Sequence, residues 1–248
     1  DWKLGNGHEI EMEYLTNTSA SEVRHYSVSL NKNTTNNVVT YIPSLVDNNH
    51  YPINELHKTV TRDENHDGTS TKDHTTEEFK NKQGQVVLKR TYENEVAHDT
   101  YYVYDDYGNL SFVLAPKAEA HTAKPDPTEL SELCYQYIYD DRNRLVEKKI
   151  PGKDWEYIIY NKLDQPIMTQ DANLRSKNEW LFTKYDVFGR VAYTGLISSG
   201  SNRRTLQDGA NSTSTLWVSK SEGPNTVAGS AVYYNGDSSV YPNFGLDK

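Results

Sequence analysis

Short apolar runs alternate with clusters of turn-forming residues along most of this chain, and within the runs apolar residues recur at every second position. In one run Tyr135, Tyr137 and Tyr139 share one face, while Cys134 and Ile138 share the other. A period of two predicts half-buried β-strands. Because both faces of these runs carry apolar or aromatic side chains, we expect a curved sheet that is covered on each side.

A seven-residue pattern lies between these runs and repeats along the chain. It begins at Tyr104, Tyr139, Tyr160 and Tyr185, each followed by Asp105, Asp140, Asn161 and Asp186 respectively. The fourth residue after the tyrosine is Gly108, Asn143, Asp164 or Gly189, and the fifth is Asn109, Arg144, Gln165 or Arg190. A less complete copy occupies residues 80–86. An internal repeat of this kind determines the architecture, which becomes an array of similar units.

The residue types in this pattern are those of tight turns. Gly, Asn and Asp reach a positive φ at the lowest cost, and Asp or Asn bonds its own backbone within a turn. We therefore predict an all-β fold of repeated antiparallel β-hairpins with loops of about three to five residues. In the third copy Pro166 replaces an apolar residue, which predicts a strand that starts late or lies at a sheet edge.

These segments resemble the YD repeats of the RHS (rearrangement hotspot) family, whose hallmarks are the leading Tyr-Asp, the later glycine and the Arg or Asn after it. Residues 185–191 match best, followed by 104–110, and the resemblance extends over 76–197. The stretches 76–90 and 145–152 are similar to RHS proteins of Bacteroidetes. The resemblance implies a spiralling β-shell, or cocoon, which in polymorphic toxins encloses a C-terminal toxin domain; teneurins use a similar barrel for adhesion.

Three regions are expected along the chain: 1–75 as N-terminal strands of the shell, 76–197 as the repeats, and 198–248 as a Ser/Asn/Gly-rich loop with degenerate terminal strands. Further elements are expected as follows: a strand pair within 1–14 that turns at 5–7, strands at 23–30, 38–42 and 56–61, a polar turn at 31–37, a mobile loop at 198–214, and strands at 217–220 and 231–234. Asp126, Pro127 and Glu129 predict a helix start inside an insertion.

Charge and composition exclude several classes of function. The 248 residues include 35 acidic and 26 basic ones, a formal net charge of −9, which disfavours a nucleic-acid surface. No apolar run approaches the ~18 residues of a membrane-spanning helix. Cys134 is the only cysteine, so an internal disulfide framework is excluded. Its place within a predicted strand indicates a buried, small hydrophobic side chain rather than a reactive thiol.

The candidate chemical sites are few. Asp63, Asn65, Asp67 and Gly68 match the opening of a calcium loop, but His74 stands where a bidentate Glu is needed. A weak calcium site and a solvated hairpin loop are both open interpretations. Eight scattered histidines show no metal-ligand spacing, so we expect no metal and no cofactor. The pairs Asp105-Asp106 and Asp140-Asp141 resemble the carboxylates of a glycosidase, yet their place in a repeating turn explains them without catalysis.

The sequence thus predicts a structural rather than an enzymatic role. We expect a segment of an RHS-type shell from a large secreted or surface-exposed bacterial protein, excised from a longer chain, that encloses or presents a C-terminal toxin or effector domain. Its partners would be the remainder of the same polypeptide and the enclosed domain, with secretion machinery or surface glycans as further candidates. The alternative is an adhesin or carbohydrate-binding module, in which Trp155, Tyr157, Trp180 and Tyr193 would stack on sugars. Open sheet edges predict self-association of the isolated chain.

Overall fold

The computed structural model describes residues 9–35, 37–66, 71–227, 230–235 and 239–243. Antiparallel strands dominate these residues, and fourteen of the strands belong to one hydrogen-bonded sheet, so the all-β prediction is confirmed. The chain forms two compact units: 1–31, 43–137 and 150–152 make the first, and 32–42, 138–149 and 153–248 make the second. The expected division at residues 75 and 197 stays a prediction.

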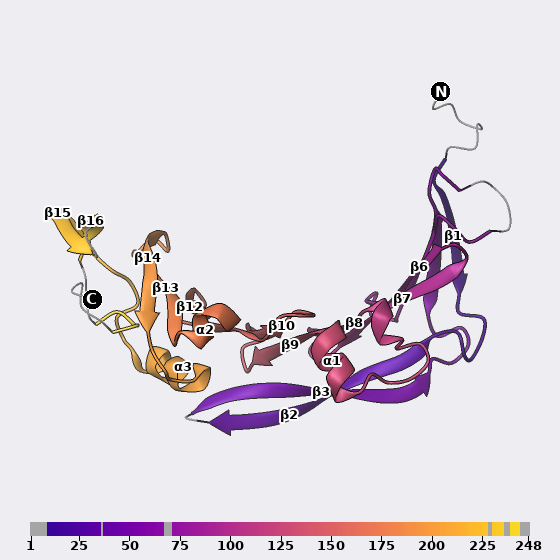
Figure 1. The fold of residues 1–248 in the computed structure, drawn as a ribbon, viewed down its shortest axis with the longest axis horizontal. Coiled ribbons are helices and arrows are strands. Elements are labelled where there is room, and N and C mark those ends of the chain that lie inside the picture. Colours follow the sequence, from indigo (N-terminus) through magenta and orange to yellow (C-terminus); the bar gives the residue numbers. More distant parts are fainter. Residues whose placement is uncertain (1–8, 36, 67–70, 228–229, 236–238, 244–248) are drawn as a thin grey trace. The chain divides into compact units, whose positions relative to one another are not determined.

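The first unit consists of consecutive antiparallel hairpins (Figure 1). Its strands, in sheet order, are β1 (Glu11–Thr16), β4 (His57–Arg62), β5 (Thr75–Lys80), β6 (Val86–Glu93), β7 (Val96–Tyr104), β8 (Leu110–Leu114) and the start of β9 (Cys134–Asp140). The first-unit parts of β2 (Arg24–Thr35) and β3 (Val38–His50) pack against one face of these hairpins, where the Tyr26 and Tyr101 rings meet edge to face at 5.5 Å.

The buried face of the first unit follows the predicted alternation. Along β5 every second residue is buried, and Phe79, Leu88, Tyr101 and Leu114 are at most 2% exposed. Burying one such side chain contributes about 1.5–3 kcal/mol. Cys134 lies in this core, fully buried, and burial raises the pKa of its thiol to about 11. The prediction that Cys134 is buried is therefore confirmed, and its low reactivity stays a prediction.

The insertion in this unit carries two short helical segments, η1 (Pro116–Ala118) and α1 (Pro127–Leu133). Asp126 accepts hydrogen bonds from the backbone N–H groups of Thr128 and Glu129, and the Glu129 carboxylate accepts one from the Asp126 N–H. This reciprocal capping satisfies backbone donors that a helix start leaves unpaired. The helix start that was predicted from these residues is therefore confirmed.

The second unit continues the hairpin array. Its strands are the end of β9, then β10 (Leu145–Lys149), β11 (Glu156–Tyr160), β12 (Pro166–Gln170), β13 (Glu179–Tyr185) and β14 (Val191–Ser198), with a separate pair, β15 (Lys220–Val227) and β16 (Ser230–Tyr234). Its helices are α2 (Ala172–Ser176) and α3 (Arg203–Ser212). The apolar core contains Ile159, Met168, Trp180 and Phe182 from the sheet and Ala210 from α3.

Four expectations about individual elements are wrong. The segment 198–214, expected to be a mobile loop, contains helix α3. The expected polar turn at 31–37 is strand through Thr35, because β2 pairs with β3. Pro166 is the first residue of β12, so this strand does not start late, and it lies between β11 and β13 rather than at a sheet edge. Proline is tolerated at this position because the first residue of a strand can lack a backbone N–H donor. The strand at 217–220 begins only at Lys220.

Apolar periodicity does not predict helix α3, because most of the residues that the helix buries are polar. Arg203, Gln207 and Ala210 face the sheet with the spacing of one helical face. Gln207 accepts a hydrogen bond from the Tyr160 N–H at 3.0 Å and donates one to the Tyr160 carbonyl at 2.8 Å, where the pairing of β11 with β12 changes register. One side chain thus satisfies both backbone groups that the irregular ladder leaves free.

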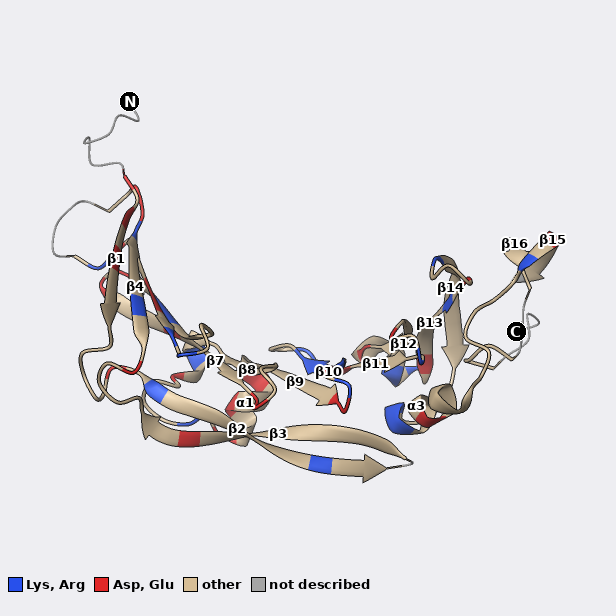
Figure 2. Ribbon diagram, turned by 180° about the vertical axis from the view of Figure 1, so that it is seen from behind, with Lys and Arg blue, Asp and Glu red and all other residues tan. Residues whose placement is uncertain are grey.

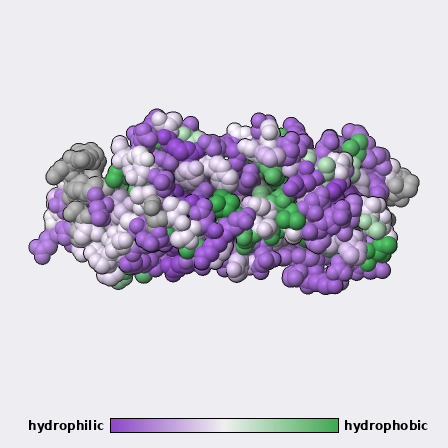
Figure 3. Space-filling model, turned by 90° about the horizontal axis from the view of Figure 1, so that it is seen from below, coloured by the Kyte–Doolittle hydropathy of each residue, from purple (hydrophilic) through white to green (hydrophobic). Residues whose placement is uncertain are grey.

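The net charge differs between the two units: the first contains 22 acidic and 11 basic residues, and the second contains 13 acidic and 15 basic residues. Figure 2 shows acidic and basic residues interspersed along both units. On the face shown in Figure 3, hydrophobic residues form small patches that hydrophilic surface separates. None of the helices in the described part of the chain has the length and apolar character that crossing a membrane requires. The predicted turn at 5–7 lies outside the described residues.

Candidate functional site

The repeated turns form the most regular set of polar interactions in the molecule. At each turn the fourth residue after the leading position has a positive φ; the five residues are Gly84 (79°), Gly108 (83°), Asn143 (57°), Asp164 (60°) and Gly189 (75°). The left-handed conformation expected from the sequence is thus present in every copy. The backbone closes each turn in the same way, with the N–H of this residue donating to the carbonyl of the Asp or Asn three residues before it.

The Asp or Asn after the leading residue organises its own turn. In the last copy, Oδ1 of Asp186 accepts hydrogen bonds from the backbone N–H groups of Phe188 and Arg190, both at 2.9 Å. Asp105, Asp140, Asn161 and Asn81 make the corresponding pair of bonds in their turns. Side chains that accept from nearby backbone donors stabilise turns in this way. This explains why one position is always Asp or Asn.

The second oxygen of the carboxylate selects the residue that follows the left-handed position. Oδ2 of Asp186 accepts from Nε of Arg190 at 2.7 Å, and Oδ2 of Asp140 accepts from Nε of Arg144 at 2.7 Å. In the first full copy Asn109 donates to Asp105 at 3.1 Å. The fifth residue after the tyrosine therefore supplies the donor, and the first residue after the tyrosine supplies the acceptor.

The two turns with Asn in place of Asp reverse this bond. Nδ2 of Asn161 donates to Oε1 of Gln165 at 2.7 Å, and Nδ2 of Asn81 donates to Oε1 of Gln85 at 2.8 Å. An amide NH₂ cannot accept a hydrogen bond, so its partner must supply an acceptor, and Gln does so. The Asp–Arg, Asp–Asn and Asn–Gln pairs thus all bring a donor and an acceptor together at the same two positions of the turn.

The burial of these groups sets their electrostatics. Asp186 is 5% exposed, and burial by itself raises its pKa. The hydrogen bonds from the Arg190 side chain and from the backbone of Arg190 and Phe188 outweigh that effect, so the pKa of Asp186 lies below its ordinary value. The carboxylate is therefore ionised and fully engaged by its own turn.

Within the second unit the leading tyrosines connect consecutive turns. The hydroxyl of Tyr160 donates to the carbonyl of Leu145, which ends the preceding turn, at 2.9 Å. The hydroxyl of Tyr185 donates to the carbonyl of Pro166 in the same relation, also at 2.9 Å. We call this connected series, residues 139–145, 160–166 and 185–191, the turn ladder. Burial raises the pKa of both tyrosines, which keeps the donating proton in place.

Arginine adds a second link within the turn ladder. Arg144 donates to the Asn161 carbonyl at 3.2 Å and pairs with the Asp164 carboxylate at 2.9 Å. Its guanidinium also lies over the ring of Tyr160, 4.9 Å from the ring centre. The close approach of neighbouring turns recurs at Gly189, where an added Cβ would lie 3.1 Å from Nε2 of Gln165. Neighbouring turns of the ladder are therefore in direct contact.

The other candidate residues have simpler positions. Asp63 and Asn65 lie in a turn in which the Asn65 N–H donates to Asp63, while Asp67 and Gly68 lie outside the described residues, so calcium binding stays untested. Among the residues that the structure describes, no three His, Cys, Asp or Glu side chains gather as metal ligands would.

The possible sugar platforms are mostly occupied by other side chains. Trp180 is 1% exposed and belongs to the core. Tyr157 has Arg175 over its ring at 4.8 Å and Trp180 stacked at 6.4 Å, and Tyr193 packs against Phe182. Core packing therefore accounts for Trp180 and Tyr193.

The sequence pattern predicted the turn residues of the site. The hydrogen bonds of Tyr160 and Tyr185 to the preceding turn could be found only in the structure.

Comparisons with known proteins give only distant similarity. No family model matches the chain, and no curated protein matches it. Among solved structures, it is similar to a chain in a crystal structure of TcdB2-TccC3-TEV, with 15% identity and a TM-score of 0.42 over 58% of this chain. It is also similar to a chain of the Photorhabdus luminescens Tc holotoxin pore with a TccC3 variant, with 14% identity and a TM-score of 0.42 over 69% of this chain.

The matched chains are much longer than this one. The match covers 7% of the chain in the first structure and 8% of the chain in the second. At this level of similarity, the interpretation of function depends on the turn ladder and on the sequence pattern, not on the matched structures.

Proposed function

We propose that this chain is a structural segment of an RHS-type repeat shell in a large secreted bacterial protein. The shell would enclose or present another domain of the same polypeptide, such as a C-terminal toxin or effector. The observation that carries this proposal is the turn ladder, because its last two turns are each linked to the preceding turn through the leading tyrosine of the repeat. An array built in this way extends by adding copies of one unit.

The mechanism in this proposal is mechanical. Hydrogen bonds between neighbouring turns fix the spacing of the hairpins at the edge where they turn, while the strand ladders fix it along their length. Asp140 and Asp186 are each engaged by two backbone N–H groups and one arginine, so their turns keep a defined conformation. A wall assembled from such units would resist local opening and keep an enclosed polypeptide apart from its surroundings.

The edge strands support a partner that covers them. In β1, Met12 is 56% and Tyr14 75% exposed, and in β14, Val191 is 58% and Leu196 57% exposed. Exposed apolar side chains on an edge strand favour pairing with further strands. In this proposal the covering strands belong to the remainder of the same polypeptide. The chain has no catalytic role in this scheme, since the Asp105 and Asp140 carboxylates serve their own turns.

Cryo-electron microscopy of the longest natural polypeptide that contains this sequence tests the proposal. We expect a closed β-wall that includes residues 76–197, with density for another domain inside it. An open or solid sheet with no enclosed density would overturn the proposal and favour an adhesin. Binding of surface glycans by that polypeptide, in the absence of any enclosed domain, would point the same way.

A further inference from the structure

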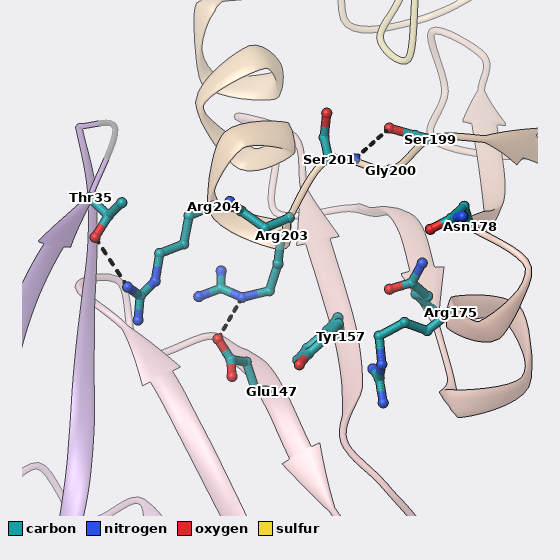
Figure 4. Close-up of a pocket in the computed structure, with 12 residues that line it drawn as sticks. Thr35, Glu147, Tyr157, Arg175, Asn178, Ser199, Gly200, Ser201, Arg203 and Arg204 are labelled. Carbon is teal, nitrogen blue, oxygen red and sulfur yellow. Dashed lines mark hydrogen bonds and ion pairs between the residues drawn. The ribbon is translucent and has the colours of Figure 1, made fainter.

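The first turn of α3 borders an open pocket of about 410 Å³ in the second unit. Figure 4 shows Arg203 and Arg204 extending from this turn toward strands of the unit, with Glu147 and Tyr157 opposite and Arg175 on the far side. Thr35 of β2 also contributes to the lining. These residues come from five separate segments of the chain, so only the folded unit brings them together.

Arg203 is the unusual member of this group. Its side chain is 3% exposed, and its Nε donates to Oε1 of Glu147 at 2.8 Å. The terminal nitrogens Nη1 and Nη2 are buried, and they have no hydrogen-bond partner among the residues that the structure describes. A guanidinium stays charged at any ordinary pH, and buried donors in native proteins are nearly always satisfied. The two nitrogens therefore indicate a partner that is not one of these residues.

The charge around the pocket indicates that this partner is an anion. Glu147 balances Arg203, and Asp154 balances Arg175 through an ion pair of 2.6 Å. Arg204 donates to the Thr35 hydroxyl at 3.1 Å, a neutral partner, so one positive charge remains in excess. The positive end of the ten-residue helix α3 lies at the same place, with Asn202 as its cap.

We propose that the pocket binds the carboxylate of a ligand, whose two oxygens accept hydrogen bonds from Nη1 and Nη2 of Arg203. The two terminal nitrogens of a guanidinium form a planar fork that matches a carboxylate. A single negative charge also equals the excess of the pocket, whereas the two charges of a phosphate dianion would exceed it and would meet stronger repulsion from Glu147. The carboxylate can come from an acidic side chain of a polypeptide or from a free small acid.

Titration of the 248-residue chain tests the site, followed by NMR of arginine side-chain N–H signals and by thermal melting. The probes are sodium formate, inorganic phosphate, and the peptides acetyl-Gly-Asp-Gly-amide and acetyl-Gly-Asn-Gly-amide. We expect saturable binding of the Asp peptide or of formate, and none of the Asn peptide. Tighter binding of the Asp peptide than of formate identifies a polypeptide as the source of the carboxylate. Equal binding identifies a free acid.

Three variants separate binding from folding. Arg203→Gln removes the fork and should weaken carboxylate binding at least tenfold, while Arg142→Gln removes the same charge from a half-exposed site outside the pocket and should leave it unchanged. Glu147→Gln removes the competing carboxylate, so it should tighten binding about tenfold and make the melting temperature rise with formate. If Arg203→Gln fails to fold, the carboxylate affinity of Glu147→Gln tests the proposal by itself.

The proposal would be overturned by any of three results: no saturable carboxylate binding, tighter binding of phosphate than of formate, or unchanged binding by Glu147→Gln.

Discussion

Tyr185 donates its hydroxyl to the backbone carbonyl of Pro166 at 2.9 Å and so ties the last turn of the ladder to the one before it. Tyr160 stands in the same relation to Leu145 one repeat earlier. In both cases the acceptor is the first strand residue after the preceding turn. In these two copies the leading tyrosine therefore stabilises the neighbouring turn, whereas the Asp or Asn that follows it stabilises its own turn.

Replacement of Tyr160 by Phe should destabilise the chain by about 0.5–1.5 kcal/mol, since the ring and its contact with Arg144 remain and only the hydrogen bond to Leu145 is lost. Urea unfolding measures the change. Tyr14→Phe, at a largely exposed side chain in β1, is the control and should change stability by less than about 0.5 kcal/mol. Equal stabilities of the two variants would show that the hydroxyl link is of no consequence.

The pairing of Asp186 with Arg190 should be exchangeable for the pairing seen between Asn161 and Gln165. Asp186→Asn alone turns an NH₂ group toward the arginine and should cost about 1–3 kcal/mol. Adding Arg190→Gln supplies an acceptor and should recover part of that loss, with a coupling of about 0.5–3 kcal/mol in a double-mutant cycle. Strictly additive effects of the two substitutions would contradict the matching of these positions.

Asp186 should make stability depend on pH in the acid range. Its pKa in the folded chain lies below the unfolded value of about 3.9, so the unfolded state binds the proton more readily. The stabilisation is therefore complete above about pH 4 and is lost as the pH falls through the lower folded pKa. Unfolding free energies between pH 5 and pH 2 should fall less steeply for Asp186→Asn than for the unmodified chain. Parallel pH curves would exclude this contribution.

Gly189→Ala should be more destabilising than Gly84→Ala. Both glycines have a φ near 75–79°, so an alanine at either position incurs the same left-handed strain of about 1–2 kcal/mol. Only at Gly189 would the new methyl group also press on the Gln165 side chain, at 3.1 Å, while nothing lies within 4 Å at Gly84. The added crowding should cost up to about 1 kcal/mol more. Thermal melting of the two variants gives the comparison, and equal losses would argue against close packing of neighbouring turns.

The 248-residue chain should self-associate through β1. This strand exposes Met12 and Tyr14, at 56% and 75%, and it lies at the edge of the sheet among the strands that the structure describes, which leaves backbone groups available for pairing. Replacing both residues by Lys should lower the apparent mass in light scattering toward that of a monomer, because a charged edge disfavours pairing. A monodisperse unmodified chain with a single cooperative melt would contradict the prediction.

The amino-acid sequence by itself determined the hairpin array and the chemistry of its turns. These features depend on residues no more than five positions apart, as in the bonds of Asp186 to Phe188 and Arg190, so a repeated local pattern contains all the information. The capped start of α1 at Asp126 follows from the same kind of local interaction.

Only the tertiary structure decided which surfaces these elements share. Helix α3 packs through Arg203 and Gln207, polar side chains that acquire a buried role only because Glu147 and the Tyr160 backbone lie opposite them. The tyrosine links and the arginine pocket likewise join residues 15 to 169 positions apart. Hydrophobic periodicity cannot predict such contacts, because they are stabilised by matched hydrogen-bond donors and acceptors that meet only when the strands are assembled.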